Sequence, residues 1–300
     1  MCRGATPPAA SIVAGDGRHR ARPRRAHRDP GAHALRLCAA LPEMLRGLPD
    51  AAWSRPTVHP GRSVKDLAAH LLHGSLRRVT ALRDGYRPPM PPIDSVEALT
   101  AFIQTDNAEF MLGTRRLSPA IVIDLVERYD PIVIDALAAV PPDAAGWPVA
   151  WAGDDHSPHR FDVAREYTEK WHHQMQIREA VGAAPLYATD LLGPLLQTLV
   201  RGLPFALRKY EAPVGTRVVL STSGALSAAW TLRREASRWS LWAGDHAEAD
   251  TRVTIPAEVL WKPWTLTMTP AQARPHVAVN GDADVVGPLL QFIAVMATRA

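Results

Sequence analysis

The sequence predicts an all-α up-and-down bundle of helices followed by a smaller α+β domain. Apolar residues recur with helical spacing from His33 to Gly182, whereas alternation with a period of two, typical of strands, begins near residue 216. With 300 residues, the chain exceeds the usual size of one domain, so two domains are expected. We therefore divide the chain into a tail at residues 1–32, a helical domain at 33–184 and an α+β domain at 185–300.

Helical segments with short connectors fill the first domain. Ser63 is suited to cap the second helix, and Asp94 or Ser95 is suited to cap the third. Ser118 opens a segment interpreted as a continued or kinked helix, and Gly182 is expected to end the last helix in the left-handed conformation. The predicted helices span residues 34–46, 64–83, 95–116, 121–137 and 161–180. Helices joined by short loops are typical of an up-and-down bundle.

The second domain combines helices with strands. A helix at residues 190–203 precedes four alternating segments, and an apolar helix at 285–297 is expected near the end of the sequence. The expected strands span residues 216–222, 228–234, 238–243 and 251–255, and a short helix at 256–261 follows them. Adjacent strands with helices at the ends predict a largely antiparallel sheet.

Positive charge is concentrated in the tail. The chain has a formal net charge of +4, but residues 1–32 hold seven arginines against two aspartates, which leaves the rest close to −1. Nucleic acid is therefore not an expected partner of the folded body. The tail lacks apolar periodicity and is expected to be disordered. Translated sequence upstream of the true start, a targeting arm and a nucleic-acid-binding arm remain open explanations.

Cysteine usage and hydropathy point to an intracellular protein. Cys2 lies in the tail and Cys38 in an apolar run, so neither a stabilising disulfide nor a Cys-based zinc site is expected. No segment carries 18 consecutive apolar residues, and the tail lacks the apolar core of a secretory signal. We expect a cytoplasmic monomer or weak dimer without a membrane partner.

Three residues on two predicted helices form the candidate site. Residues four apart on a helix lie about 40° apart around the axis and about 6 Å apart along it, so Glu169 and His173 can aim at one point. His70, from a neighbouring helix, would complete a ligand set that zinc accepts while leaving a position open. The alternatives are a core histidine at His70 and a plain salt bridge between Glu169 and His173, because a buried glutamate needs a partner.

Two segments resemble a known family. They are Val64-Lys-Asp-Leu-Ala-Ala-His70, with Trp53 before it, and the stretch from Thr168 to Gly182 that contains Glu-Lys-Trp-His-His. Both resemble the amino-terminal domain of the mycothiol-dependent maleylpyruvate isomerase family, which belongs to the DinB-like superfamily of four-helix metal bundles. Residues 277–284, Val-Ala-Val-Asn-Gly-Asp-Ala-Asp, and the helix predicted after them are similar to the family's second, sterol-carrier-like domain.

The resemblance implies a metal and a thiol. In the family, one histidine on the second helix and a Glu-x-x-x-His pair on the last helix bind a divalent metal, and His70, Glu169 and His173 match these positions. Zinc is the first expectation, and nickel, manganese and iron also suit imidazole–carboxylate sites. The implied activity is that of an enzyme using mycothiol or a similar low-molecular-weight thiol, as a thiolate, for isomerisation or S-transfer on a small electrophile.

The functional assignment leaves one alternative open, and the sequence departs from the family pattern at two positions. The alternative is a non-catalytic binding protein with a structural metal and an apolar ligand in its carboxy-terminal domain. Arg62 stands where family members often have an aromatic residue, and Gln176 stands where many have an aspartate that could orient a ligand. No catalytic or thiol-binding residue is assigned from the sequence.

Other histidines are weighed against the three candidate ligands. His73 lies one turn further along the same helix as the first of them and is an alternative ligand. His156 and His159 are expected in a solvated loop, with the mouth of the site as the alternative. His172 is expected on a different helix face from its neighbour, because successive residues point about 100° apart.

Arginines and tryptophans supply the last candidates. Arg165 and Arg178 would bind an anionic substrate or form surface salt bridges. Trp171 is expected to be a core anchor. The strand tryptophans are expected to pack in a core or to line an apolar pocket; they are Trp230, Trp239 and Trp242.

Overall fold

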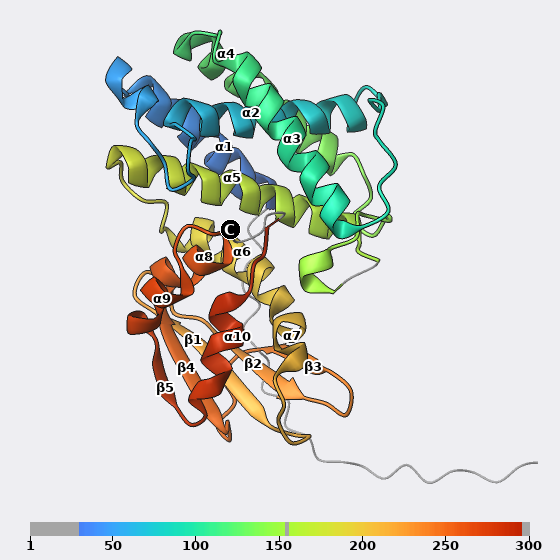
Figure 1. Cartoon of the computed structure of the whole chain (residues 1–300), viewed down its shortest axis with the longest axis vertical. Helices are drawn as coiled ribbons and strands as arrows, with labels where there is room; N and C mark the ends of the chain where they lie inside the picture. Colours follow the sequence, from blue (N-terminus) through green and yellow to red (C-terminus); the bar gives the residue numbers. More distant parts are fainter. Residues whose placement is uncertain (1–29, 154–155, 296–300) are drawn as a thin grey trace, which may run out of the picture.

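The computed structural model describes residues 30–153 and 156–295, so the expectations for residues 1–29 of the tail and for Cys2 lie outside the described residues. The tail boundary expected after residue 32 is wrong, because residues 30–32 are the first residues of α1. Five long helices form the upper part of the molecule in Figure 1. They are α1 (Pro30–Arg46), α2 (Val64–Leu82), α3 (Val96–Thr114), α4 (Pro119–Ala138) and α5 (His159–Val181). All the helices predicted for this part are present, and α4 continues through Pro131 without a break.

Local signals fix the ends of the helices that carry the candidate site. Ser63 caps α2 through a capping box, in which its hydroxyl accepts from the backbone N–H of Asp66 and the Asp66 carboxylate accepts from the backbone N–H of Ser63. The cap of α3 is Ser95, one of the two residues predicted for it. Gly182 ends α5 with φ 72°, as predicted, in a conformation that residues with a Cβ rarely adopt.

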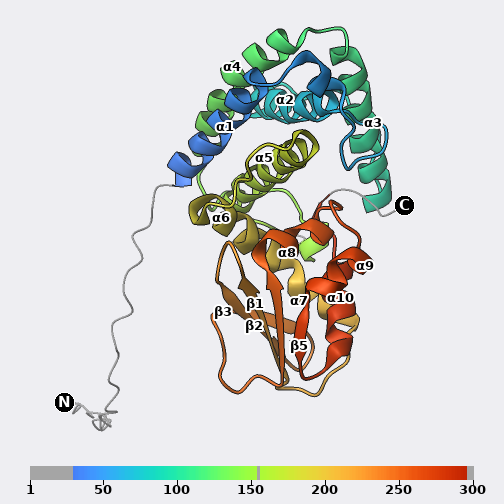
Figure 2. The same cartoon turned by 90° about the vertical axis from the view of Figure 1, so that its left-hand side faces the viewer.

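The helices pack around α2 and α5. Helix α2 contacts α3, α4 and α5, and α1 contacts α4 and α5. Figure 2 shows α5 lying between the other long helices and the rest of the chain. The side of α5 that faces the helices contributes Ile177 to a buried apolar cluster with α1, α2 and α4; its other members include Leu41, Leu45, Leu67, Leu71, Leu72, Val122 and Val126.

The lower part of the molecule is a five-stranded sheet with helices beside it (Figure 1). The strands are β1 (Arg217–Ser223), β2 (Ala229–Arg234), β3 (Trp239–Ala243), β4 (Thr251–Pro256) and β5 (Ala278–Asn280), in the order β3-β2-β1-β4-β5. Only the β1–β4 pair is parallel among these neighbours, in agreement with the predicted, largely antiparallel sheet. Strand β5 has three residues and was not predicted.

Helices of this part are short. They are α6 (Thr189–Leu199), α7 (Leu203–Ala206), α8 (Ala257–Trp264), α9 (Pro270–Ala273) and α10 (Val286–Gln291). Single 3-10 turns supplement the helices of both parts; they are η1 (Asp50–Ser54), η2 (Ala150–Ala152), η3 (Val200–Gly202), η4 (Leu207–Lys209), η5 (Arg274–His276) and η6 (Ala283–Val285).

The prediction of one long apolar helix at residues 285–297 is wrong. Helix α10 ends at Gln291, and Phe292 adopts an extended conformation instead. The backbone N–H of Ala294 then donates to the carbonyl of Trp264, and the ring of Phe292 packs on that tryptophan. Burial of Phe292 and Ala294 against α8 thus overrides the local helical pattern. Residues 296 and 297 lie outside the described part.

One apolar cluster joins the sheet to the long helices. Leu37 of α1 and Trp171 of α5 belong to the same buried cluster as Leu220 of β1 and Trp261 of α8. The rings of Trp171 and Trp261 meet edge to face at 5.0 Å, and Trp171 is fully buried, as expected for a core anchor. Helix α5 therefore has one side in each of two apolar clusters, which holds it at the junction of the two parts.

Cys38 gives a simple test of this packing. Its side chain is buried in α1, and burial raises the pKa of its thiol to about 12. Because only a thiolate is readily alkylated, iodoacetamide should leave Cys38 of a Cys2→Ser variant unmodified at pH 8 and should label it fully in urea. Mass spectrometry after one hour measures the label, and rapid labelling of the native protein would contradict the packing of α1.

Candidate metal centre

The structure brings His70, Glu169 and His173 together. His70 comes from α2, and the other two residues lie one turn apart on α5. One ligand atom from each residue lies within 4.8 Å of the other two. Nε2 of His173 is 3.5 Å from Oε2 of Glu169, and the rings of His70 and His173 stand nearly perpendicular, with centroids 4.6 Å apart. The three candidate residues thus form one cluster across two helices.

The cluster fits a divalent cation. Donor atoms bound to one ion at about 2 Å lie about 3–4 Å apart. The 3.5 Å between Nε2 of His173 and Oε2 of Glu169 falls in this range, and the 4.8 Å that bounds all three residues is slightly above it. Nδ1 of His70 is buried and has no hydrogen-bond partner among the described residues. A buried ring nitrogen without a partner is costly, and a metal bound through this nitrogen would satisfy it.

Protonation states in the cluster also suit a metal. Burial, followed by the neighbouring His173, holds the pKa of His70 well below its usual value. Partial burial alone would raise the pKa of Glu169, but the surrounding histidines, with His173 3.5 Å from its carboxylate, hold the pKa below its usual range. A neutral His70 imidazole and an ionised Glu169 carboxylate therefore prevail near pH 7, and these are the forms that bind metal ions.

Solvent reaches the cluster from the side of Glu169. The Glu169 side chain is 42% exposed, whereas that of His173 is 8% exposed. A separate hollow of ≈ 480 Å³ lies beside η1 and the start of α2, where Trp53, Arg62 and Arg115 line it, and none of the three cluster residues does. The cluster is thus accessible at its carboxylate, and this hollow is a neighbouring feature.

Two further histidines have other roles. His73 does not join the cluster: its Nδ1 is 3.1 Å from Oδ1 of Asn107, and its ring stacks on Phe110 of α3. His172 is not turned away from His173 as predicted, since the two ring centroids are 4.0 Å apart. Its Nδ1 lies 2.6 Å from the Thr168 carbonyl, and burial with His173 lowers its pKa to about 3. His172 is therefore a neutral packing neighbour of the cluster.

The residues before α5 also differ in part from expectation. His156 is exposed, as predicted. His159 is not in a solvated loop, because it is the first residue of α5, is buried, and places Nε2 2.9 Å from the carbonyl of Leu137. Its chain position alone suggested a loop, but contact with the end of α4 buries it.

Both arginine candidates already have partners within the protein. Arg178 is buried and donates to the carbonyls of Ala40 and Ala184, which ties α5 to α1 and to the chain after Gly182. Arg165 pairs with Asp162 one turn before it on α5. Both side chains therefore have structural roles.

The strand tryptophans divide between core and surface. Trp230 and Trp239 are buried in the sheet's apolar cluster, in agreement with the expected packing. Trp242 is 60% exposed, so packing was the wrong expectation for it. It lies at the edge strand β3, where alternation turns it to solvent.

Sequence reasoning missed His59. The loop after η1 turns at Gly61, which has φ 72°, and it brings the His59 ring to within 5.7 Å of the His173 ring, centroid to centroid. Burial and His173 lower the pKa of His59 to about 4. Nε2 of His59 lies 3.1 Å from Oε1 of Gln176, and the same oxygen is 2.7 Å from Nδ1 of His173. No periodic pattern marks a loop histidine, so the sequence carried no signal for it.

These observations define a class of protein: a helical part with a His–Glu–His cluster, followed by an α+β part with a five-stranded sheet. Residues 34–178 match the family model described as the mycothiol maleylpyruvate isomerase N-terminal domain. The chain therefore carries the N-terminal domain of the mycothiol maleylpyruvate isomerase family.

Solved structures support the fold. A histidine-to-alanine mutant of the mycothiol-dependent maleylpyruvate isomerase is similar with a TM-score of 0.51 at 14% identity, over 84% of this chain and 92% of that one. A second structure of the enzyme, without that mutation in its description, gives a TM-score of 0.50 at 13% identity over the same shares. No curated protein matches the chain. Among the described helices, none is long and apolar enough to span a membrane.

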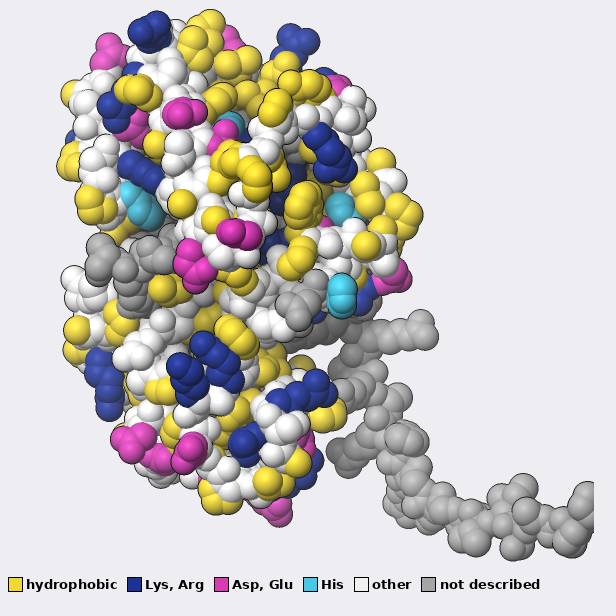
Figure 3. All heavy atoms as spheres, turned by 45° about the vertical axis from the view of Figure 1, so that its right-hand side comes forward, with side chains coloured by type: hydrophobic (Ala, Val, Ile, Leu, Met, Phe, Trp, Pro, Cys, Tyr) yellow, Lys and Arg dark blue, Asp and Glu magenta, His cyan; other side chains and the backbone are white. Residues whose placement is uncertain are grey.

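The charge on the surface is mixed. Figure 3 shows acidic and basic side chains on both the helical half and the sheet half of one face. Histidine side chains also reach the surface at several places in the helical half, so an exposed histidine by itself does not mark the candidate site. The cluster is distinguished by its geometry instead.

Proposed function

We propose that this protein is a metal-dependent enzyme that uses mycothiol or a similar low-molecular-weight thiol for isomerisation or S-transfer on a small electrophilic substrate. The match of residues 34–178 to the family's N-terminal domain supports the thiol, and the cluster supports the metal. The observation that carries the proposal is the convergence of His70, Glu169 and His173, with solvent access at Glu169.

The roles of the three residues follow from their chemistry. His70 and His173 would bind the metal as neutral imidazoles, and Glu169 as a carboxylate at the accessible side. Zinc suits this donor set best, and nickel, manganese or iron are the other choices. A divalent ion held here would supply Lewis acidity and would lower the pKa of an incoming thiol. Three protein ligands leave a position open, as a catalytic site requires.

The finer architecture belongs to the same proposal. Residues 33–184 would form a DinB-like four-helix bundle with an additional helix, and residues 185–300 a sterol-carrier-like domain. Contacts of α2 with α3, α4 and α5 are compatible with a bundle. The sheet-containing part, which packs on α5 through Trp261, would take part in binding the thiol or substrate.

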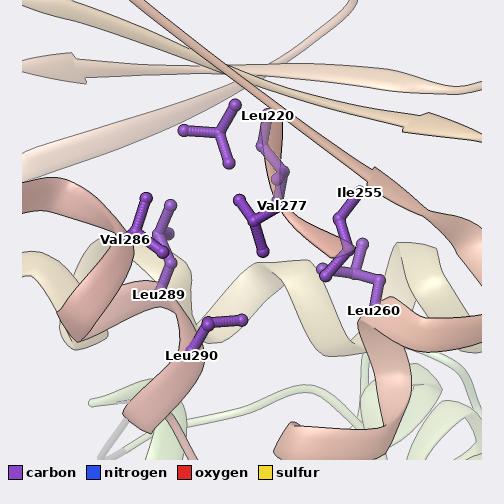
Figure 4. Close-up of a pocket in the computed structure, with 8 residues that line it drawn as sticks. Leu220, Ile255, Leu260, Val277, Val286, Leu289 and Leu290 are labelled. Atoms are coloured by element: carbon purple, nitrogen blue, oxygen red, sulfur yellow. The ribbon is translucent and has the colours of Figure 1, made fainter. Parts of the chain in front are cut away.

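The alternative, an apolar ligand inside the carboxy-terminal part, receives little support from the cavity there. The side chains in Figure 4 converge between the sheet, α8 and α10; the lining residues are Leu220, Val253, Ile255, Leu260, Val277, Val286, Leu289 and Leu290. The volume accessible inside this cavity is ≈ 10 Å³. A space of this size holds about one water molecule, so a lipid would have to open the core first.

Metal analysis and activity measurements test the proposal. The purified protein should contain close to one metal ion per chain, and it should isomerise maleylpyruvate or conjugate 1-chloro-2,4-dinitrobenzene only when mycothiol is present. A chelator should abolish turnover, zinc should restore it, and His173→Ala should remove it because one ligand is lost. Metal retention without thiol-dependent turnover of either compound would favour the binding protein instead.

A further inference from the structure

A single amide links the candidate metal centre to the sheet-containing part of the chain. Gln176 is almost fully buried on α5, three residues beyond His173. Its Oε1 faces Nδ1 of His173 at 2.7 Å and Nε2 of His59 at 3.1 Å. Its Nε2 donates to Oγ1 of Thr267, at 2.7 Å, in the loop between α8 and α9. Both ends of the amide are therefore engaged.

The loop that supplies Thr267 is itself held in a defined conformation. Oγ1 of Thr267 lies 2.9 Å from Oγ1 of Thr265, which donates to the carbonyl of Trp261 at the end of α8. Between the two threonines, Leu266 has φ 58°, the only positive φ of a non-glycine residue in the described chain. Such strained backbone persists where surrounding contacts impose it, and it is frequent near functional sites. The position of Thr267 is thus determined by α8.

The direction of the amide sets which nitrogen of His173 carries the proton. An amide oxygen only accepts, so Nδ1 of His173 must donate to Oε1 of Gln176. In the neutral ring this leaves the lone pair on Nε2, the atom that faces Glu169. If the amide were reversed, its NH₂ group would face Nδ1, the proton would move to Nε2, and the ligand atom would be blocked. Donation to Thr267 is what holds the amide in the first orientation.

We propose that Gln176 is a positioning residue through which Thr267, in the loop after α8, fixes the ring tautomer of His173 and thereby the metal affinity of the cluster. The inference rests on the proposed metal site and adds to it a dependence on the carboxy-terminal part. His59, in the loop between η1 and α2, also approaches Oε1 of Gln176 and stabilises the same orientation of the amide. Groups that hold the second nitrogen of a ligand histidine commonly set its orientation and basicity.

Thr267→Val removes the hydroxyl and leaves every residue of the helical site in place. We expect it to weaken Zn²⁺ binding about 10-fold, at the lower end of the 10–100-fold cost of losing such outer contacts, whereas Gln176→Leu should cost about 100-fold. Thr267→Ser keeps the hydroxyl and should bind Zn²⁺ as the wild type does. Thr254→Val is the matched control, because it removes a hydroxyl paired with Ser221 inside the sheet, away from the cluster.

Two measurements on the full-length protein decide the matter. Competition with a fluorescent chelator gives the Zn²⁺ dissociation constant of each variant. Nitrogen-15 NMR of the metal-free protein gives the tautomer of His173, which should be Nδ1–H in the wild type and in Thr267→Ser, and mixed in Thr267→Val. A loss of affinity through general destabilisation would appear equally in Thr254→Val and would not move the tautomer.

The outcomes separate this inference from the proposed function. If His173→Ala loses the metal while Thr267→Val keeps wild-type affinity and tautomer, the metal site stands and the role of the loop is wrong. If the wild-type protein binds neither Zn²⁺ nor Co²⁺, the proposed function fails and the inference fails with it. Weaker binding in Thr267→Val with rescue by Thr267→Ser supports the link.

Discussion

His70→Ala should weaken Zn²⁺ binding by more than about 100-fold, because losses of outer-shell contacts already cost 10–100-fold and this change removes a ligand itself. His70 is the sole cluster residue from α2, so without it the site keeps only the two groups of α5. Two ligands from one helix turn cannot enclose an ion that prefers tetrahedral geometry. The dissociation constant from chelator competition is the measurement.

His73→Ala is the matched control for this change. It removes a buried histidine from the same helix, one turn away, whose ring contacts Asn107 and Phe110 of α3. We expect some loss of stability but unchanged Zn²⁺ affinity. Equal effects of the two substitutions on affinity would mean that the metal binds elsewhere or that packing of α2 alone is responsible. Retained affinity in His70→Ala would remove this residue from the ligand set.

Local chemistry explains which parts of the site and fold were predictable. Glu169 and His173 are four residues apart on one helix, so their proximity follows from helix geometry. The end of α5 at Gly182 and the start of α2 at Ser63 follow from short-range capping preferences. The approach of His70 depends on packing between two helices, and the family resemblance supplied that pairing.

The features that escaped prediction depend on contacts between distant residues. Gln176 and Thr267 are 91 positions apart, and no local pattern relates an amide on a helix to a hydroxyl in a loop. His59 reaches the site from an irregular loop, where periodicity gives no information. The end of α10 is decided by the burial of Phe292 against Trp264. In each case tertiary packing selects a conformation that the local sequence leaves open.

The family resemblance leads to the expectation of an aspartate at position 176, where this chain has Gln176. An amide, unlike a carboxylate, has a donor end as well as an acceptor end. Only a side chain with both ends can accept from His173 and donate to Thr267 at once. The amide of Gln176 thus makes the link to the loop after α8 possible.

Lys170→Met should lower the free energy of unfolding by about 3–5 kcal/mol. Nζ of Lys170 donates to Oδ1 of Asp130 on α4 at 2.8 Å and to Oγ of Ser75 on α2 at 2.7 Å, and all three side chains are buried. Burial alone would lower the pKa of Lys170, but the carboxylates of Asp130 and Glu166 raise it above its usual value, so the ammonium is retained. Removing it leaves the Asp130 carboxylate buried without its cation.

The double variant Lys170→Met/Asp130→Leu tests whether the unpaired Asp130 carboxylate accounts for the loss of stability. Replacing both members of a buried ion pair with apolar groups is often neutral, so the double variant should recover most of the stability that the single change loses. Asp245→Ala breaks an exposed pair with Arg252 and should cost less than about 1 kcal/mol. Urea denaturation of the metal-free proteins, followed by tryptophan fluorescence, gives all four free energies. A double variant as unstable as Lys170→Met would show that Ser75 and the packing of α2 against α4 and α5, rather than the unpaired carboxylate, account for the loss.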